Sequence, residues 1–173
     1  MIIRLFLLIF LGLSCSVQAQ PKLAVLDFEL KDMTLAPGIK TEVERTAAIK
    51  PMLETQLQQA GFSIIPVSKE RQQFMDSGVG YLFNHHDVAA QLARANNADF
   101  ILVGRLHKPS FLFSYLIVQL VEAKSGKLSE RWVVEVKGPQ KKLTSKGVES
   151  LVVKINAFFN DYNAPENKVF NTN

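Results

Sequence analysis

The sequence contains a single cysteine, Cys15, and none after it. The chain beyond that point can form no internal disulfide and offers no thiolate for a zinc site or for nucleophilic catalysis. Its serines fit no nucleophile-elbow pattern, and Gly78 and Gly80 lack the later glycine and lysine of a phosphate-binding loop. The sequence therefore predicts no catalytic residue set, no metal site and no cofactor, and it favours a protein that is not an enzyme.

Long hydrophobic runs are also missing. The run from Leu5 to Leu13 is too short to cross a bilayer stably. It follows one positive charge, Arg4, and leads into small and polar residues that end at Ala19, which is the three-part layout of a secretory signal. We expect residues 1–19 to be a signal peptide, the mature protein to begin at Gln20, and its location to be the periplasm.

Two alternatives to simple cleavage stay open. The first is an uncleaved membrane anchor. The second is a lipoprotein acylated at Cys15, for which the small Ser14 fits, whereas Gly12 stands where a lipobox has a branched apolar residue.

Composition beyond the signal indicates one ordinary globular domain. The chain is 47% hydrophobic and 21% charged, and its net charge of +4 falls to +3 once Arg4 is removed. Its basic residues are scattered, which predicts a soluble surface and no nucleic-acid partner. We expect a single α/β domain over 20–162 and a flexible tail over 163–173.

Apolar periodicity predicts the elements of that domain. Three buried strands are expected at 22–28, 62–67 and 100–104. Helices are expected at 41–60, 68–75 and 84–95, with loops at 31–40 and 76–83. A capping-box pattern that begins at Thr41 marks one helix start, and Ser68 is expected to cap another. Pro51 predicts either a kink or the start of the main helix.

The pattern changes after residue 110. The segments 111–122 and 128–137 flank a glycine turn and predict an antiparallel hairpin, followed by an amphipathic helix at 146–161. Strands joined by helices should be parallel. The predicted fold is α/β, a single mixed five-stranded sheet of three parallel strands in β-α units plus a carboxyl-terminal β-hairpin, with helices on the faces.

Three motifs carry a family resemblance that covers nearly the whole mature chain. They are the segment Leu23–Leu30, the segment Gly104–Ser110 before a long strand, and Val134–Gly138 followed by Lys146-Gly147-Val148. Together they resemble a bacterial family of exported proteins of unknown function. In fold this family is similar to the amino-terminal domain of TolB and to the CsgG and LpoB group of envelope proteins.

The resemblance implies an assembly or interaction module rather than an enzyme. It also connects the chain with periplasmic quinoprotein alcohol oxidation, as an accessory protein. One departure matters, because many family members carry a cysteine pair before the third helix where this chain has Asn84-His85-His86. A disulfide or thiol role at that loop cannot be carried over.

A polar cluster is predicted where the parallel strands end. If the first and third strands are neighbours, Asp27, Glu29, His107 and Lys108 come together there. Such a set could bind a small polar ligand or a metal, or support acid–base chemistry. The alternative is a local ion pair that fixes the strand ends. Separately, His85-His86-Asp87 is interpreted as a helix cap, with metal binding as its alternative.

Interaction residues are expected near the hairpin. Phe111 and Phe113 begin its first strand, and Lys141 and Lys142 belong to a basic loop that follows it. The outer strand would present an open edge for strand addition unless the terminal helix covers it. We therefore expect an envelope protein partner, with a small-ligand- or metal-binding periplasmic protein as the rival function.

Overall fold

The computed structural model describes residues 20–137 and 141–164, and the predicted signal peptide and most of the predicted tail lie outside them. No helix in this part of the chain is long and apolar enough to cross a membrane. The elements, in chain order, are β1 (Lys22–Val25), β2 (Glu29–Asp32), α2 (Lys40–Ala47), α3 (Ile49–Gln59), β3 (Ser63–Ile65), α4 (Lys69–Met75), α5 (Tyr81–Asn84), α6 (His86–Ala95), β4 (Phe100–Lys108), β5 (Phe113–Glu122), β6 (Leu128–Lys137) and α7 (Lys141–Asn163).

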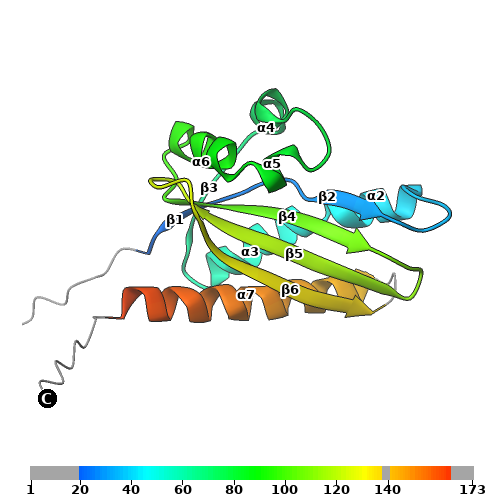
Figure 1. Cartoon of the computed structure of the whole chain (residues 1–173). Helices are drawn as coiled ribbons and strands as arrows, with labels where there is room; N and C mark the ends of the chain where they lie inside the picture. The colour runs from blue at the N-terminus through cyan, green and yellow to red at the C-terminus, as the bar shows by residue number, and fades with distance from the viewer. Residues whose placement is uncertain (1–19, 138–140, 165–173) are drawn as a thin grey trace, which may run out of the picture.

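The strands form one mixed sheet, in which β3, β1, β4, β5 and β6 lie side by side in that order (Figure 1). β1 is parallel to both β3 and β4, because helices return the chain to the same end of the sheet before each new strand. β4, β5 and β6 are antiparallel neighbours. The turn before β6 uses Gly126, whose φ of +70° suits glycine. The predicted α/β fold is confirmed.

The sheet has one strand more than predicted. β2 pairs in parallel with the second half of β4, while β1 pairs with its first half. Between Val25 and Glu29 this line has three residues where β4 has only Val103 and Gly104, so it contains a bulge. Polar residues in β2 made the segment resemble a loop. Pairing with β4 overrides that local preference.

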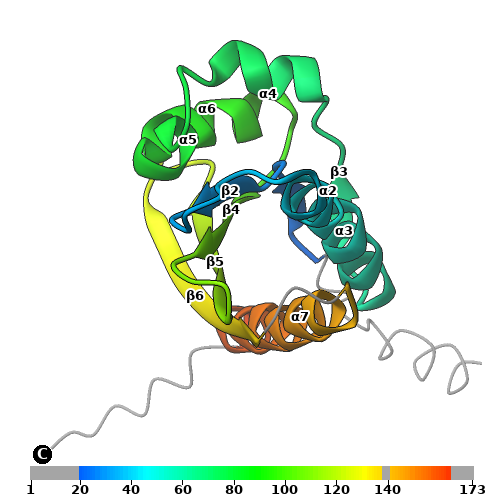
Figure 2. The ribbon, with the colours of Figure 1, turned by 90° about the vertical axis from the view of Figure 1, so that its right-hand side faces the viewer.

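Helices cover the two faces of the sheet (Figure 2). Alternate side chains along β4 separate into two apolar clusters, as the pleat requires. Leu102 and Leu106 pack with α3 and α7, whereas Ile101 and Val103 pack with α5 and α6. The fold is therefore a sheet between two helical layers.

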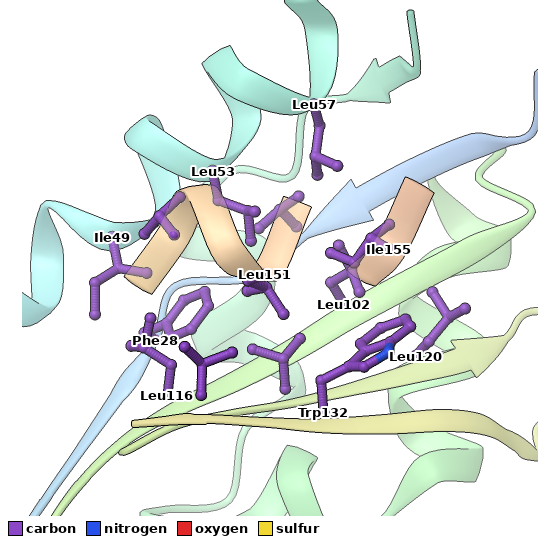
Figure 3. Packing of buried hydrophobic residues seen from close by; sticks show 14 of the residues in the cluster. Phe28, Ile49, Leu53, Leu57, Leu102, Leu116, Leu120, Trp132, Leu151 and Ile155 are labelled. Atoms are coloured by element: carbon purple, nitrogen blue, oxygen red, sulfur yellow. The ribbon is translucent and has the colours of Figure 1, made fainter. Parts of the chain in front are cut away.

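The larger cluster fills the space between α3, α7 and the curved sheet (Figure 3). Leu53, Leu151 and Ile155 are fully buried there. Trp132 reaches this cluster from β6 and meets the ring of Phe158 edge-on, with ring centroids 5.9 Å apart. Each fully buried aliphatic side chain contributes about 1.5–3 kcal/mol, so this layer contributes much of the stability.

The first helical segment differs from the expectation in detail. α2 begins after Ile39 without a side-chain cap, so the capping box expected at Thr41 is wrong. The chain breaks at Ala48, and Pro51 lies in the first turn of α3, where its missing N–H costs little. The cap at Ser68 is confirmed, because its Oγ accepts a hydrogen bond from the N–H of Arg71 at 3.3 Å.

The observed boundaries of α5, α6 and α7 also differ from the predicted ones. The expected loop at 76–83 contains the start of α5, and α6 begins at His86 rather than at Asn84. α7 begins at Lys141, so the predicted basic loop is partly its first turn. The hydroxyl of Thr144 in that early turn accepts a hydrogen bond from Arg45, a long-range contact that no local pattern announces.

Candidate functional site

The predicted strand-end cluster is divided among separate partners, beginning with Asp27. Its carboxylate lies 3.3 Å from the ammonium of Lys50 on α3. Its backbone N–H donates to Gln72 at 2.8 Å, and the Gln72 amide donates back to the Asp27 carbonyl at 3.2 Å. These bonds attach the bulge to α3 and α4. They satisfy Asp27 without His107 or Lys108.

Glu29 forms an ion pair with Arg105 across the β2–β4 ladder. The Arg105 Nη2 and Nε atoms donate to one carboxylate oxygen at 2.9 and 3.2 Å, and the backbone N–H of Gly80 donates to the other. The guanidinium also lies 4.0 Å from the ring centroid of Phe83. An open hollow of about 350 Å³ lies beside Glu29. The contacts fix α5 to the sheet.

His107 and Lys108 point to opposite faces, as neighbours on a strand must. His107 is paired with Lys31 on β2 and with Tyr115 on β5, and its Nδ1 atom is buried without a hydrogen-bond partner among the described residues. Lys108 faces α2 instead. The structure therefore brings Glu29 and His107 to one face and does not assemble all four predicted residues into one site.

Lys108 belongs to a buried ionic network, which consists of Asp32, Glu42, Arg45 and Lys108. The Lys108 ammonium lies 3.1 Å from Glu42 and 3.9 Å from Asp32. The other Glu42 oxygen lies 3.1 Å from Arg45. These side chains are at most 6% exposed, and the two positive charges balance the two negative ones.

Neutral partners complete the network. Arg45 donates from Nε to Thr144 on α7 at 2.7 Å and from Nη2 to Ser114 on β5 at 2.9 Å. The network thus joins α2, β2, β4, β5 and α7 at one end of the sheet. Sequence reasoning missed Glu42 and Arg45, because opposite charges three residues apart also occur on solvent-exposed helix faces. The spacing alone therefore does not indicate a buried pair.

Nearby hydrogen bonds and the charge of Lys108 shift the pKa of Asp32. Burial would raise the pKa of this carboxyl, but hydrogen bonds from Thr34 and Gly38 and the charge of Lys108 together hold its pKa below the ordinary value. The carboxylate therefore contributes stability that is present at neutral pH and is lost as the pH falls through its folded pKa. Such a group acts as a fixed acceptor, not as a proton donor.

The paired histidines do not form a metal site. His85 stacks on Tyr81, with ring centroids 4.2 Å apart, and its Nδ1 bonds the carbonyl of the same residue. His86 bonds Gln119 through Nε2 at 3.0 Å. In the described part of the chain no three His, Cys, Asp or Glu side chains are grouped so that they could hold a metal ion. The predicted cap is also absent, since His85 precedes α6 without a side-chain bond.

Exposed apolar residues occur in the loop after β2 and in the turn from β4 into β5, and Figure 1 shows these two segments at the same end of the sheet. We call this the distal apolar surface, and its members are Met33, Leu35, Phe111, Leu112 and Phe113. A bond from the Met33 N–H to the Lys108 carbonyl, 2.9 Å long, holds its two loops together.

The members of this surface are well exposed. Leu35 is 98% exposed, Leu112 71% and Phe111 59%. Phe113 lies opposite Lys137 in the hairpin register, so a positive charge borders the surface. Lys142 is exposed in the first turn of α7, and the side chain of Lys141 lies outside the described residues. The predicted aromatic residues are thus accessible, whereas the predicted basic loop is in part a helix.

The outer strand β6 is covered on one face only. Trp132, Val134 and Val136 point towards α7, while Val133 is 52% exposed on the other face. In both views no helix lies over that outer face of β6 (Figure 1, Figure 2). The hairpin prediction is confirmed, and the terminal helix covers the inner face of β6.

The environment of His107 is expected to make the stability of the fold depend on pH. Desolvation by burial lowers the pKa of this imidazole, and the positive charges of Lys31 and Arg105 lower it further. The folded state then binds fewer protons than the unfolded state, so stability is lost as the pH falls below about 6.5. In urea unfolding at pH 7.5 and pH 5.0, His107→Gln should lose less stability than the wild type. An equal loss in both proteins would contradict this assignment.

Comparisons with known proteins agree with the fold. A family model, DUF3280, described as a protein of unknown function (DUF2380), matches residues 21–155. No curated protein matches the sequence. Among solved structures, the hypothetical protein CT253 from Chlamydia trachomatis has a TM-score of 0.55 at 10% identity, over 82% of this chain and 99% of that one.

Two further structures are similar. Lipoprotein GNA1162 from Neisseria meningitidis has a TM-score of 0.51 at 14% identity, over 78% of this chain and 96% of that one. PelC from Paraburkholderia phytofirmans, described as a dodecamer, has a TM-score of 0.50 at 15% identity, over 79% and 84%. At these identities the likeness concerns the fold alone. The expected family of unknown function is confirmed, whereas the likeness to TolB stays a prediction and the quinoprotein connection is not supported.

Proposed function

The chain belongs to the DUF3280 family of proteins of unknown function, and we propose that it works as an exported, non-catalytic module that binds a protein partner in the bacterial cell envelope. The binding surface in this proposal is the distal apolar surface, which consists of Met33, Leu35, Phe111, Leu112 and Phe113. The connection with quinoprotein alcohol oxidation is left out of the proposal.

One observation carries the proposal. Five large apolar side chains, from the loop after β2 and from the turn into β5, are exposed at one end of the sheet, whereas most apolar side chains of the inner strands are buried in the two cores. Contiguous exposed apolar residues with a polar border are typical of interaction surfaces. Phe111 and Phe113 add aromatic anchors, the residue type enriched where interfaces gain most of their energy.

The polar residues support a structural role over catalysis. Asp27 is paired with Lys50, Glu29 with Arg105, and Lys108 with Glu42. Each ion pair bridges two different elements, so each has a clear role in holding the fold. A small ligand or metal bound at Asp27, Glu29 or Lys108 would have to compete with these ion pairs.

The envelope location rests on the predicted signal peptide, with lipidation at Cys15 as the alternative anchor. The similar fold of a Neisseria lipoprotein fits that location, and the PelC dodecamer fits a fold that can carry an assembly surface. These are analogies of fold and add support only in that sense.

In-cell photo-crosslinking tests the proposed surface. A photoreactive amino acid is placed at position 111 in the full chain, and at position 74 as the matched control, because Phe74 is 88% exposed on α4, away from the distal apolar surface. A discrete protein adduct is expected at position 111 and not at position 74. Replacing Leu112 by serine should reduce that adduct about tenfold, as loss of an interface anchor does.

Three results would reject the proposal. Equal adducts at both positions would mean that the surface is not special. Binding of the purified chain to anionic lipid vesicles through Phe111, without a protein adduct, would make the surface a membrane contact. Loss of the adduct in Asp27→Asn or His107→Ala, with the fold intact, would favour the ligand-binding function. Both variants should keep the adduct.

A further inference from the structure

The free edge of β6 is the second accessible surface of the hairpin. β6 is ten residues long and, within the described residues, pairs only with β5. It contains no proline to interrupt an added strand. An open hollow of about 260 Å³ lies between the end of β6, at Glu135 and Val136, and Ser150 of α7. Such an edge is a template for another strand.

The charges on β6 match those of a second, antiparallel copy of β6. In a symmetric antiparallel pair, opposing residues must lie on the same face, so the pair is centred on a residue and not between two. Centring it on Val133 places Arg131 of one copy opposite Glu135 of the other, and the symmetry repeats this ion pair on the far side. Val133 then meets Val133 of the second copy.

Neighbouring registers are poorer. A pair centred on Val134 places Arg131 opposite Lys137 of the second copy, which is a like-charge contact. A pair centred on Trp132 places Arg131 opposite Val133 and leaves Glu135 opposite Ser129. Opposite charges across strands stabilise a sheet and like charges destabilise it, so the sequence of β6 selects the Val133-centred register.

Across the β5–β6 ladder of one chain, Arg131 and Glu135 have no charged partner. Across the ladder to β5, Arg131 faces Gln119 and Glu135 faces Tyr115, neither of which is charged at neutral pH. Arg131 and Glu135 are exposed, and Val133 is 52% exposed. A second copy would therefore give the two charges partners and cover the exposed valine.

We propose that the protein forms a homodimer in which the β6 strands of two copies pair antiparallel about Val133, joining the two sheets into one. The hairpin residues of the distal apolar surface lie at the start of β5, opposite the end of β6, whereas Val133 lies in the middle of β6. The centre of the proposed dimer interface is therefore away from that surface, which stays free. The dimer does not depend on the proposed partner function, and either can fail alone.

Charge reversal tests the register. Sedimentation of the chain recovered from the periplasm should show a dimer. Arg131→Glu and Glu135→Arg should each weaken it about tenfold, because each creates two like-charge contacts. The double variant R131E/E135R restores both ion pairs with reversed polarity and should recover the wild-type dimer. A monomeric wild type, or a double variant no better than the singles, would overturn the proposal.

Cysteine crosslinking tests the same geometry independently. The chain without Cys15 contains no cysteine, so in a Cys15→Ser background Val133→Cys would be the sole thiol. Opposed residues of an antiparallel pair have Cα atoms about 4.5–5.5 Å apart, within reach of a disulfide. Val133→Cys should therefore form a covalent dimer on oxidation.

Glu135→Cys in the same background is the matched control. In the proposed register its own copy lies four residues along the ladder, about 14 Å away, which is beyond disulfide reach. It should stay monomeric under reducing-agent-free electrophoresis. Equal crosslinking at both positions, or none at Val133→Cys, would overturn the proposal. A disulfide adduct with a different protein at β6 would not rescue it.

Discussion

Replacing Glu42 by alanine is expected to lower the free energy of unfolding by about 3–5 kcal/mol, the usual cost of breaking a buried ion pair. Glu42 is the shared counter-charge of Arg45 and Lys108, at 3.1 Å from each, and its side chain is 3% exposed. Without it, one negative charge, Asp32 at 3.9 Å from Lys108, would remain among two buried positive ones. Removing one member leaves the others desolvated and unpaired, which explains the large effect.

Glu44 offers a matched control on the same helix. It lies two residues away, and its pair with Lys40, 3.8 Å apart, is exposed on both sides. Glu44→Ala should change stability by less than about 1 kcal/mol, because solvent screens an exposed pair. Urea unfolding of both variants at pH 7 measures the difference. If Glu42→Ala cost no more than Glu44→Ala, the network would not be the structural tie that its geometry indicates.

The same comparison shows where sequence reasoning reached its limit. Glu42 and Glu44 are the same residue type on one short helix, and nothing local distinguishes the buried one from the exposed one. What distinguishes them is the arrival of Lys108 from β4 and of Thr144, through Arg45, from α7. Contacts between residues far apart in the chain depend on how the helices are placed, and local periodicity carries no information about that.

The hairpin, in contrast, could be predicted from local sequence alone. β6 was predicted with its observed bounds, because its alternation is set by a pleat with one buried face, and Trp132, Val134 and Val136 record it directly. β2 was missed because its polar side chains are satisfied by partners: Glu29 by Arg105, and Asp32 by Thr34, Gly38 and Lys108. A polar strand is visible in a sequence only when its partners are known.

The predicted site shows both effects together. Proximity of the first and third strands was correct, since β1 and β4 are neighbours. The inference that four polar side chains would converge failed, because successive residues such as His107 and Lys108 alternate across the sheet. The bulge before Glu29 then shifts the register of β2 relative to β1, and no sequence pattern marked its position.

That bulge leads to the second large expected effect. Gly104→Ala should lower the free energy of unfolding by about 1–3 kcal/mol, the usual cost of overpacking a core. The bulge directs the ring of Phe28 over the backbone of Gly104, between Leu102 and Leu106, and a Cβ at position 104 would overlap that ring. Phe28 is 8% exposed, so it has little room to retreat.

A double-mutant cycle separates this contact from a general intolerance of β4 to substitution. Phe28→Ala alone should cost about 3–5 kcal/mol through the cavity it leaves. In the double variant the Cβ of residue 104 no longer meets a ring and fills part of that cavity. The double variant should therefore be about 1–2 kcal/mol more stable than the sum of the single effects implies. Additive effects would mean that glycine is required at position 104 for some reason other than the ring, and that the bulge does not depend on the packing of Phe28 on Gly104.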